Sequence, residues 1–190
     1  MRRGKTLKMI EKECSGNILD LGCGTGSVSN YLYDKGFNIE GCDVSKRRLN
    51  IAKNKNKNIP YFLFDIDKEI LKKKYDTIIM MGILEGIESL PWDILKKLKK
   101  SLKKNGKIIF EVPNANAAQK RFRVLFGMDP LDPLYPKVYL FTKKRIMNII
   151  KRSNYKIIRF TTTKFIQLKG INIPMVNSLA QEFFIVIEKS

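Results

Sequence analysis

Short apolar runs alternate along this chain with stretches in which apolar residues recur every three or four positions. The runs predict buried strands, and the stretches between them predict amphipathic helices. Because the two kinds of element alternate, the pattern predicts βαβ units and an α/β fold, a doubly wound sheet with helices on both faces. Helices are expected at 26–35 and 46–54, and strands at 17–21, 38–43, 61–64, 75–80 and 107–112.

A longer helix is expected to begin at Pro91 and to run to about Lys104, where Asn105-Gly106 stops it. Its apolar face is formed by Leu95, Leu98 and Leu102, and lysines occupy the other faces. The remaining elements are a helix at 143–152, a strand at 155–163 and a final apolar run at 183–187. That last run suits a buried antiparallel strand.

Residues 18–26, Ile-Leu-Asp-Leu-Gly-Cys-Gly-Thr-Gly, join the first strand to the first helix through three alternating glycines. Glycine has no Cβ and accepts positive φ, so such a loop lets bare backbone approach a ligand. A dinucleotide-binding loop has the spacing G-x-G-x-x-G. Here Ser27 or Ser29 stands where its third glycine is required. The loop is therefore predicted to bind another ligand, and an ordinary turn is the alternative.

Asp43 ends the second predicted strand, about twenty residues after the glycines. In a right-handed βαβ unit, a carboxylate at this point can accept hydrogen bonds from both hydroxyls of a ribose. The alternative is that Asp43 caps the following helix, a role that Ser45 could fill equally well.

These residues resemble the class I S-adenosylmethionine-dependent methyltransferases. The resemblance covers roughly residues 15–160. Residues 18–26 are similar to the family's glycine motif, 39–45 to its ribose-binding strand and 64–67 to its adenine-binding loop. Residues 75–85 are similar to its fourth motif and 102–114 to its fifth strand. Residues 110–141 are similar to the type 11 and type 12 branches, which act on small molecules or are associated with methionine biosynthesis.

The resemblance implies a Rossmann-like seven-stranded sheet in the order 3-2-1-4-5-7-6 with an antiparallel last strand, and S-adenosylmethionine as the cofactor. This cofactor carries a sulfonium cation and no phosphate, so an acidic residue beside the glycines is favourable. In the family, the glycine loop meets the methionine part, and the acidic residues after the next two strands meet the ribose and the adenine. The implied contacts are Asp20, Gly22, Cys23, Gly24, Thr25, Gly26, Asp43, Val44, Asp65, Ile66 and Met81.

Methyl transfer from a sulfonium is an in-line displacement that alignment and desolvation can largely drive. In this branch of the family the fourth motif usually reads Leu-Glu-His, whereas here it is Leu84-Glu85-Gly86. Glu85 is therefore the candidate catalytic base or substrate clamp. Weaker candidates are Glu111, Tyr135 and Tyr139.

The chain has 190 residues, of which 44% are hydrophobic. A chain of this length and composition is expected to form one domain, over residues 1–190. Residues 1–14 form a basic N-terminal segment, and 113–141 and 164–181 are expected to cap the substrate side. With neither a signal peptide nor a long apolar run, the protein is expected to be cytoplasmic and not membrane-bound. It has no histidine, and its three cysteines match no metal-binding spacing, so no metal is expected.

The formal net charge of +19 is large enough to attract polyanions, which makes RNA a candidate partner. A compositional bias toward Lys, Asn and Ile explains the charge equally well. Arginines alternate with aromatic residues at Arg121, Phe122, Arg123 and Phe126, a mixture that could bind phosphate or stack a base. The alternative is an amphipathic helix with the aromatic residues packed inward.

The sequence therefore predicts a methyltransferase that modifies an oxygen or nitrogen atom of a small molecule. The alternatives are an RNA or protein methyltransferase, a cofactor-binding but inactive regulatory partner, and a basic nucleic-acid-binding module without a cofactor.

Overall fold

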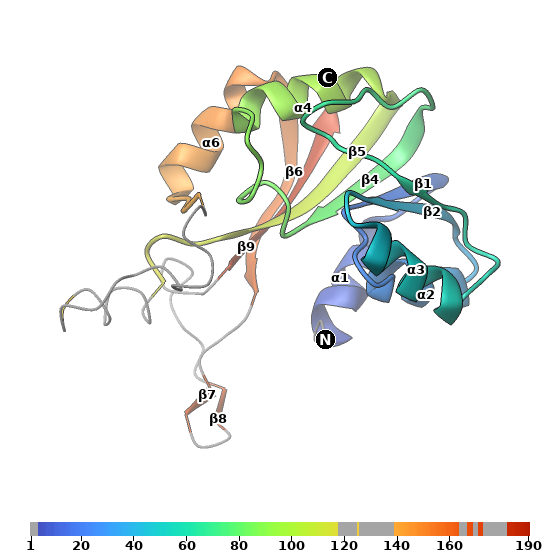
Figure 1. Cartoon of the computed structure of the whole chain (residues 1–190). Helices are drawn as coiled ribbons and strands as arrows, with labels where there is room; N and C mark the ends of the chain where they lie inside the picture. Colours follow the sequence, from blue (N-terminus) through green and yellow to red (C-terminus); the bar gives the residue numbers. More distant parts are fainter. Residues whose placement is uncertain (1–3, 118–124, 126–138, 164–166, 169–170, 173–181) are drawn as a thin grey trace.

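The computed structural model describes residues 4–117, 125, 139–163, 167–168, 171–172 and 182–190, and a seven-stranded sheet forms its centre (Figure 1). The strands of this sheet are β1 (Asn17–Leu21), β2 (Asn38–Asp43), β3 (Tyr61–Leu63), β4 (Tyr75–Met81), β5 (Leu102–Pro113), β6 (Tyr155–Thr163) and β9 (Glu182–Lys189). Their order is β3-β2-β1-β4-β5-β9-β6. Neighbours among β1 to β5 are parallel, and β9 is antiparallel to both β5 and β6. The predicted order and antiparallel last strand are confirmed.

Helices cover both faces of the sheet (Figure 1). One face carries α1 (Gly4–Glu13), α2 (Ser27–Asp34) and α3 (Lys46–Lys55), and the other carries α4 (Pro91–Lys100) and α6 (Lys143–Arg152). A separate two-stranded ribbon joins β7 (Gln167–Leu168) to β8 (Ile171–Asn172). No helix within the described ranges is long and apolar enough to span a membrane.

Neighbouring residues of the central strands supply the two layers of the core, because successive side chains of a strand point to opposite faces. Ile78 and Ile108 belong to the cluster beneath α4 and α6. Ile79 and Ile109 pack in the other cluster, with Ile10 of α1. The near-continuous apolar runs of β4 and β5 are thus those of strands buried on both sides.

The helix predicted from Pro91 to about Lys104 is shorter than expected, and this prediction was wrong at its end. The helix ends at Lys100, and Leu102 begins β5, paired with Tyr75. Tyr75 N also donates to Ser101 O at 2.9 Å, so strand pairing replaces the next helical turn. Leu102 is fully buried from its place in the strand, which is why the helical spacing of leucines was misleading.

Helix α1 was missed, because residues 1–14 were interpreted only as a basic segment. Ile10 is fully buried against the sheet, and Glu13 forms an ion pair of 3.0 Å with Arg159 of β6. Other expectations fall on residues outside the described ranges: the arginine–aromatic stretch, Tyr135 and most of the two predicted caps.

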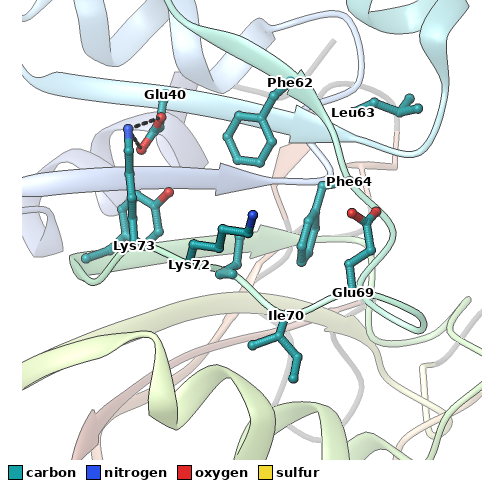
Figure 2. Close-up of a pocket in the computed structure, with 10 residues that line it drawn as sticks. Glu40, Phe62, Leu63, Phe64, Glu69, Ile70, Lys72 and Lys73 are labelled. Atoms are coloured by element: carbon teal, nitrogen blue, oxygen red, sulfur yellow. Dashed lines mark hydrogen bonds and ion pairs between the residues drawn. The ribbon is translucent and has the colours of Figure 1, made fainter.

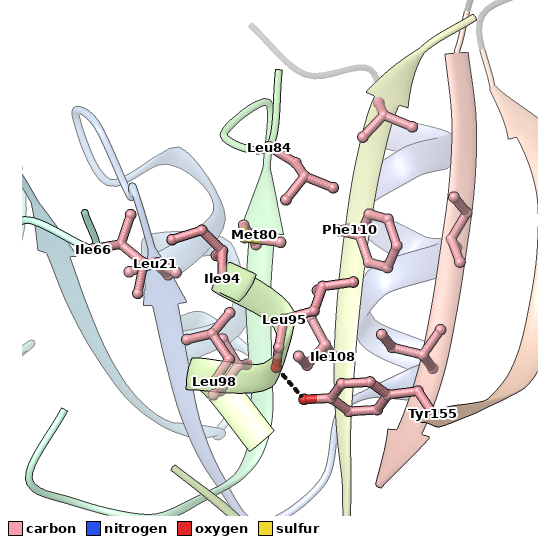
Figure 3. Close-up of a cluster of buried hydrophobic side chains, with 14 of the residues drawn as sticks. Leu21, Ile66, Met80, Leu84, Ile94, Leu95, Leu98, Ile108, Phe110 and Tyr155 are labelled. Carbon is pink, nitrogen blue, oxygen red and sulfur yellow. Dashed lines mark hydrogen bonds between the residues drawn. The ribbon is translucent and has the colours of Figure 1, made fainter. Parts of the chain in front are cut away.

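The layer beneath α4 includes a buried polar contact (Figure 3). The hydroxyl of Tyr155, in β6, donates to the main-chain oxygen of Leu95 in α4 at 2.9 Å. Burial raises the pKa of Tyr155, so this hydroxyl keeps its proton at neutral pH. The bond joins the helix to an edge strand of the sheet.

Replacing Tyr155 with Phe removes this donor while keeping the ring. We expect the free energy of unfolding to fall by about 1 kcal/mol, the typical net value of a buried hydrogen bond. Urea unfolding followed by circular dichroism measures it, and Tyr33→Phe on the surface of α2 is the matched control. Equal stability of the two variants would show that the contact contributes nothing.

Candidate functional site

The glycine loop after β1 and Asp43 at the end of β2 meet at one edge of the sheet. The two strands are parallel and in register, with Leu21 beside Cys42. Gly22 N and Cys23 N both donate to Cys42 O, at 2.8 and 2.9 Å. The loop therefore folds over the end of the neighbouring strand.

Asp43 holds the loop in this position. Its Oδ2 accepts from Gly24 N at 2.9 Å and its Oδ1 from Ser45 N at 2.8 Å. The helix cap is Ser45, whose Oγ accepts from Arg48 N. The helix-capping role, one of the two considered for Asp43, is thus filled by Ser45. Asp43 is 5% exposed, and two main-chain donors fix the orientation of its carboxylate.

The glycines of the loop serve different purposes. Gly24 has φ +56°, and a Cβ added there would meet nothing within 4 Å, so its backbone faces open space. Gly22 has φ +72°, and a Cβ there would lie 2.1 Å from Ile83 Cδ1. The positive φ favours glycine at position 22, and any larger residue would also displace the end of the Ile83 side chain.

Asp20, Cys23 and Met81, three of the predicted contact residues, are buried. Asp20 is buried, and its Oδ2 accepts from Ser29 Oγ at 2.6 Å, which links β1 to α2. Cys23 packs with Leu49 and Tyr61, and burial raises the pKa of its thiol, so it is not a reactive thiolate. Met81 lies in the core at the end of β4.

A cavity of about 240 Å³ opens where β1, β2 and β4 end. It brings together Gly22, Asp43, Val44, Asp65 and Ile66 from the predicted set. Asp20, Cys23, Gly24, Thr25, Gly26 and Met81 do not line it.

Other residues of the cavity were missed by sequence reasoning. Arg48 comes from the first turn of α3, and Ile83 and Ile87 from the turns after β4. Asp67 also lines the cavity, two residues after Asp65. The acidic residues at every second position, Asp65 and Asp67, could have indicated from the sequence that Asp67 lines the cavity. No local pattern in the sequence identifies Arg48.

The acidic loop after β3 is held in place at several points. Asp65 forms an ion pair of 3.1 Å with Lys68, and Lys97 Nζ of α4 donates to Ile66 O at 2.6 Å. Asp67 accepts from Ser89 N at 2.8 Å and Glu88 N at 3.1 Å. Burial raises the pKa of the Asp67 carboxyl, but the hydrogen bonds from Ser89 and Glu88 outweigh it and the net shift is downward. Asp67 is therefore ionised at neutral pH.

Glu85, the candidate base, does not line this cavity. It is half-buried, and its main-chain oxygen accepts from Tyr139 N at 2.8 Å. Phe141 N donates to Pro113 O, so the chain after β4, the end of β5 and residues 139–141 come together. The weaker candidate Glu111 is buried, where it accepts a hydrogen bond from Thr163. Among the described residues, no group of three or more His, Cys, Asp or Glu could hold a metal.

The family model described as "Methyltransferase domain" matches residues 3–159. A ubiquinone biosynthesis O-methyltransferase of Coxiella burnetii is 32% identical over 141 residues, which cover 69% of this chain and 58% of that protein. One of Pelagibacter ubique is 37% identical over 93 residues, which cover 47% of this chain and 38% of the relative. The chain therefore spans less than two thirds of the length of these relatives.

Solved structures share the fold. A SAM-dependent methyltransferase of Thermotoga maritima superimposes with a TM-score of 0.74 at 18% identity, over 97% of this chain and 87% of that chain. The magnesium protoporphyrin IX methyltransferase of Synechocystis with bound SAH gives 0.72 at 18% identity, over 98% of this chain and 83% of that chain. Since the family model covers most of the chain, the protein belongs to the methyltransferase-domain family of class I S-adenosylmethionine-dependent methyltransferases.

Proposed function

We propose that this protein transfers the methyl group of S-adenosylmethionine to an oxygen or nitrogen atom of a small-molecule acceptor. The observation that carries the proposal is the cavity in which Gly22, Asp43 and Asp65 meet at the carboxyl ends of three parallel strands. Relatives named as ubiquinone biosynthesis O-methyltransferases, and a neighbour named as a magnesium protoporphyrin IX methyltransferase, support a small acceptor.

The cavity fits the proposed cofactor in its charge. The lining contains the three carboxylates of Asp43, Asp65 and Asp67 and the basic side chain of Arg48. A pyrophosphate would be repelled here, whereas the cationic sulfonium and ammonium groups of S-adenosylmethionine are attracted. When bound, the cofactor supplies an electrophilic methyl group on its sulfonium sulfur.

Each side of the cavity has a proposed role in holding the cofactor. Asp43 would accept hydrogen bonds from the ribose hydroxyls, because its carboxylate is already oriented by Gly24 N and Ser45 N. Asp65 would accept from the adenine amino group, and Ile66 and Ile83 would cover the ring. Preorganised groups lose little entropy on binding, which favours affinity.

Glu85 is proposed to act on the acceptor and not on the cofactor. It follows β4 closely and is joined through its backbone to Tyr139, outside the cofactor cavity. A carboxylate there could orient an acceptor hydroxyl or amine, or remove its proton. Gly86 stands where the family usually has histidine, and this favours a cofactor-binding but inactive regulatory partner as the second candidate function.

Replacing Asp43 with Ala should weaken the affinity for S-adenosylmethionine by about 1.5–3 kcal/mol, the loss of charge-assisted hydrogen bonds. Calorimetric titration with S-adenosylmethionine and S-adenosylhomocysteine measures this, and NAD serves as the negative ligand. Asp93→Ala, which removes an exposed carboxylate from α4, should bind like the parent.

Because Asp43 also holds the glycine loop, Asp43→Asn is needed as a second variant that keeps one acceptor oxygen. It keeps one of the two main-chain hydrogen bonds, so the loop should be disturbed less than in Asp43→Ala, and circular dichroism establishes that it is folded; binding should still be weaker, since the charge is lost. Unchanged affinity in both variants contradicts the ribose assignment. Failure of the parent chain to bind either adenosyl ligand contradicts the proposed function itself.

Glu85→Gln should lower turnover by about 10²-fold, the usual contribution of a positioned acid or base, while S-adenosylhomocysteine affinity stays within twofold. Formation of S-adenosylhomocysteine is measured with 3,4-dihydroxybenzoate, histamine and total RNA as separate acceptors. Glu88→Gln is the control, since its side chain is exposed. Equal turnover of the Glu85→Gln and Glu88→Gln variants would contradict the proposed role of Glu85 in catalysis and indicate a structural role.

The acceptor panel also separates the remaining alternatives. Turnover with RNA alone would replace the small-molecule proposal with RNA methylation. Tight binding of S-adenosylmethionine without turnover on any acceptor would favour the regulatory partner.

A further inference from the structure

A second cavity, of about 290 Å³, lies at the β3 edge of the sheet (Figure 2). Phe64 and Tyr75 in its lining belong to the core cluster beneath α4 and α6, so the cavity is on that face. Residues 64–74 connect β3 to β4 without a helix. This part of the sheet is therefore flanked by an irregular segment with a turn at 66–68, and the cavity lies beside it.

The interior of this cavity is apolar. Phe62 and Phe64 meet edge to face with ring centroids 6.2 Å apart, and Leu71 packs beside them. Leu63 and Ile70 also line the cavity and are 59% and 63% exposed. Large apolar side chains that meet water around a concave surface favour the binding of an apolar body.

The charged groups of the rim are not equivalent. Lys73 forms an ion pair with Glu40 at 3.1 Å, and burial together with a hydrogen bond to Glu40 raises the pKa of Tyr75. Glu69 accepts from Asp65 N at 2.8 Å. In the part of the chain that the structure describes, Lys72 makes no hydrogen bond or ion pair, and Figure 2 shows it extended into the cavity.

We propose that this cavity binds a small organic monoanion with an aromatic or branched apolar body and a single carboxylate or sulfonate group. The anionic group would pair with the ammonium of Lys72, and the apolar body would lie against Phe62, Phe64 and Ile70. Glu69, on the same rim, disfavours ligands with more than one negative charge. Phe64 is the residue that this cavity shares with the cofactor cavity, so the two sites are adjacent but distinct.

The probe for this site is 1-anilinonaphthalene-8-sulfonate, whose fluorescence rises in apolar surroundings. It is titrated into the full chain in 0.15 M salt, which screens the general basic surface, with S-adenosylhomocysteine in excess to occupy the cofactor cavity. We expect saturable binding that Lys72→Glu weakens at least tenfold. Lys74→Glu makes the same charge change at an exposed neighbour outside the cavity and should alter the affinity less than twofold.

A second pair of variants tests the apolar side of the site. Ile70→Glu places a charge in the cavity and should also weaken binding at least tenfold, whereas Ile51→Glu on α3, 41% exposed, should change it less than twofold. Circular dichroism and S-adenosylhomocysteine titration establish that each variant is folded.

Equal loss of binding in both lysine variants, or in neither, overturns the proposal, as does probe binding that is seen only when S-adenosylhomocysteine is left out of the titration. Because the matched variants decide the result, the test is independent of whether the chain proves to be an active methyltransferase.

Discussion

Parallel pairing of β1 with β2 on one side and with β4 on the other is the constraint on which the site depends. It brings three strand ends to one edge, so segments that are far apart in the chain deliver side chains to one cavity. The hydrogen bond from Gly24 N to Asp43 Oδ2 then closes the loop over that edge. The Asp43 carboxylate accepts the hydrogen bond of a main-chain amide of the loop, and this bond fixes the orientation of the carboxylate.

The same arrangement explains how the cavity stays open between well-packed layers. Asp20 and Ser29 join β1 to α2 beneath the loop, and Cys23 packs with Leu49. On the opposite side, Lys97 of α4 fixes the loop that carries Ile66. Contacts from both helical layers thus hold the walls of the cavity.

Local charge and overall charge differ in sign in this protein. The chain carries a formal net charge of +19, yet the cavity at the ends of β1, β2 and β4 is lined by Asp43, Asp65 and Asp67. Short-range interactions in a partly buried site are screened less than those across the surface. The local charge at the cavity is therefore set by these carboxylates, and the net charge of the chain by itself carries little information about it.

The sequence by itself determined the alternation of strands and helices along the chain and the glycine loop, whereas the order of the strands in the sheet and the contacts Asp43, Val44, Asp65 and Ile66 were implied by the resemblance to the methyltransferase family. Hydrophobic periodicity and glycine spacing are local properties, so they can be recognised without knowing the packing. The end of α4, helix α1 and the inclusion of Arg48 and Ile83 in the cavity were decided by tertiary structure. Leu102 leaves the helix because it pairs with Tyr75, and Asp20 turns to Ser29 because α2 packs over β1. Such contacts join residues distant in the chain, and only the folded sheet brings them together.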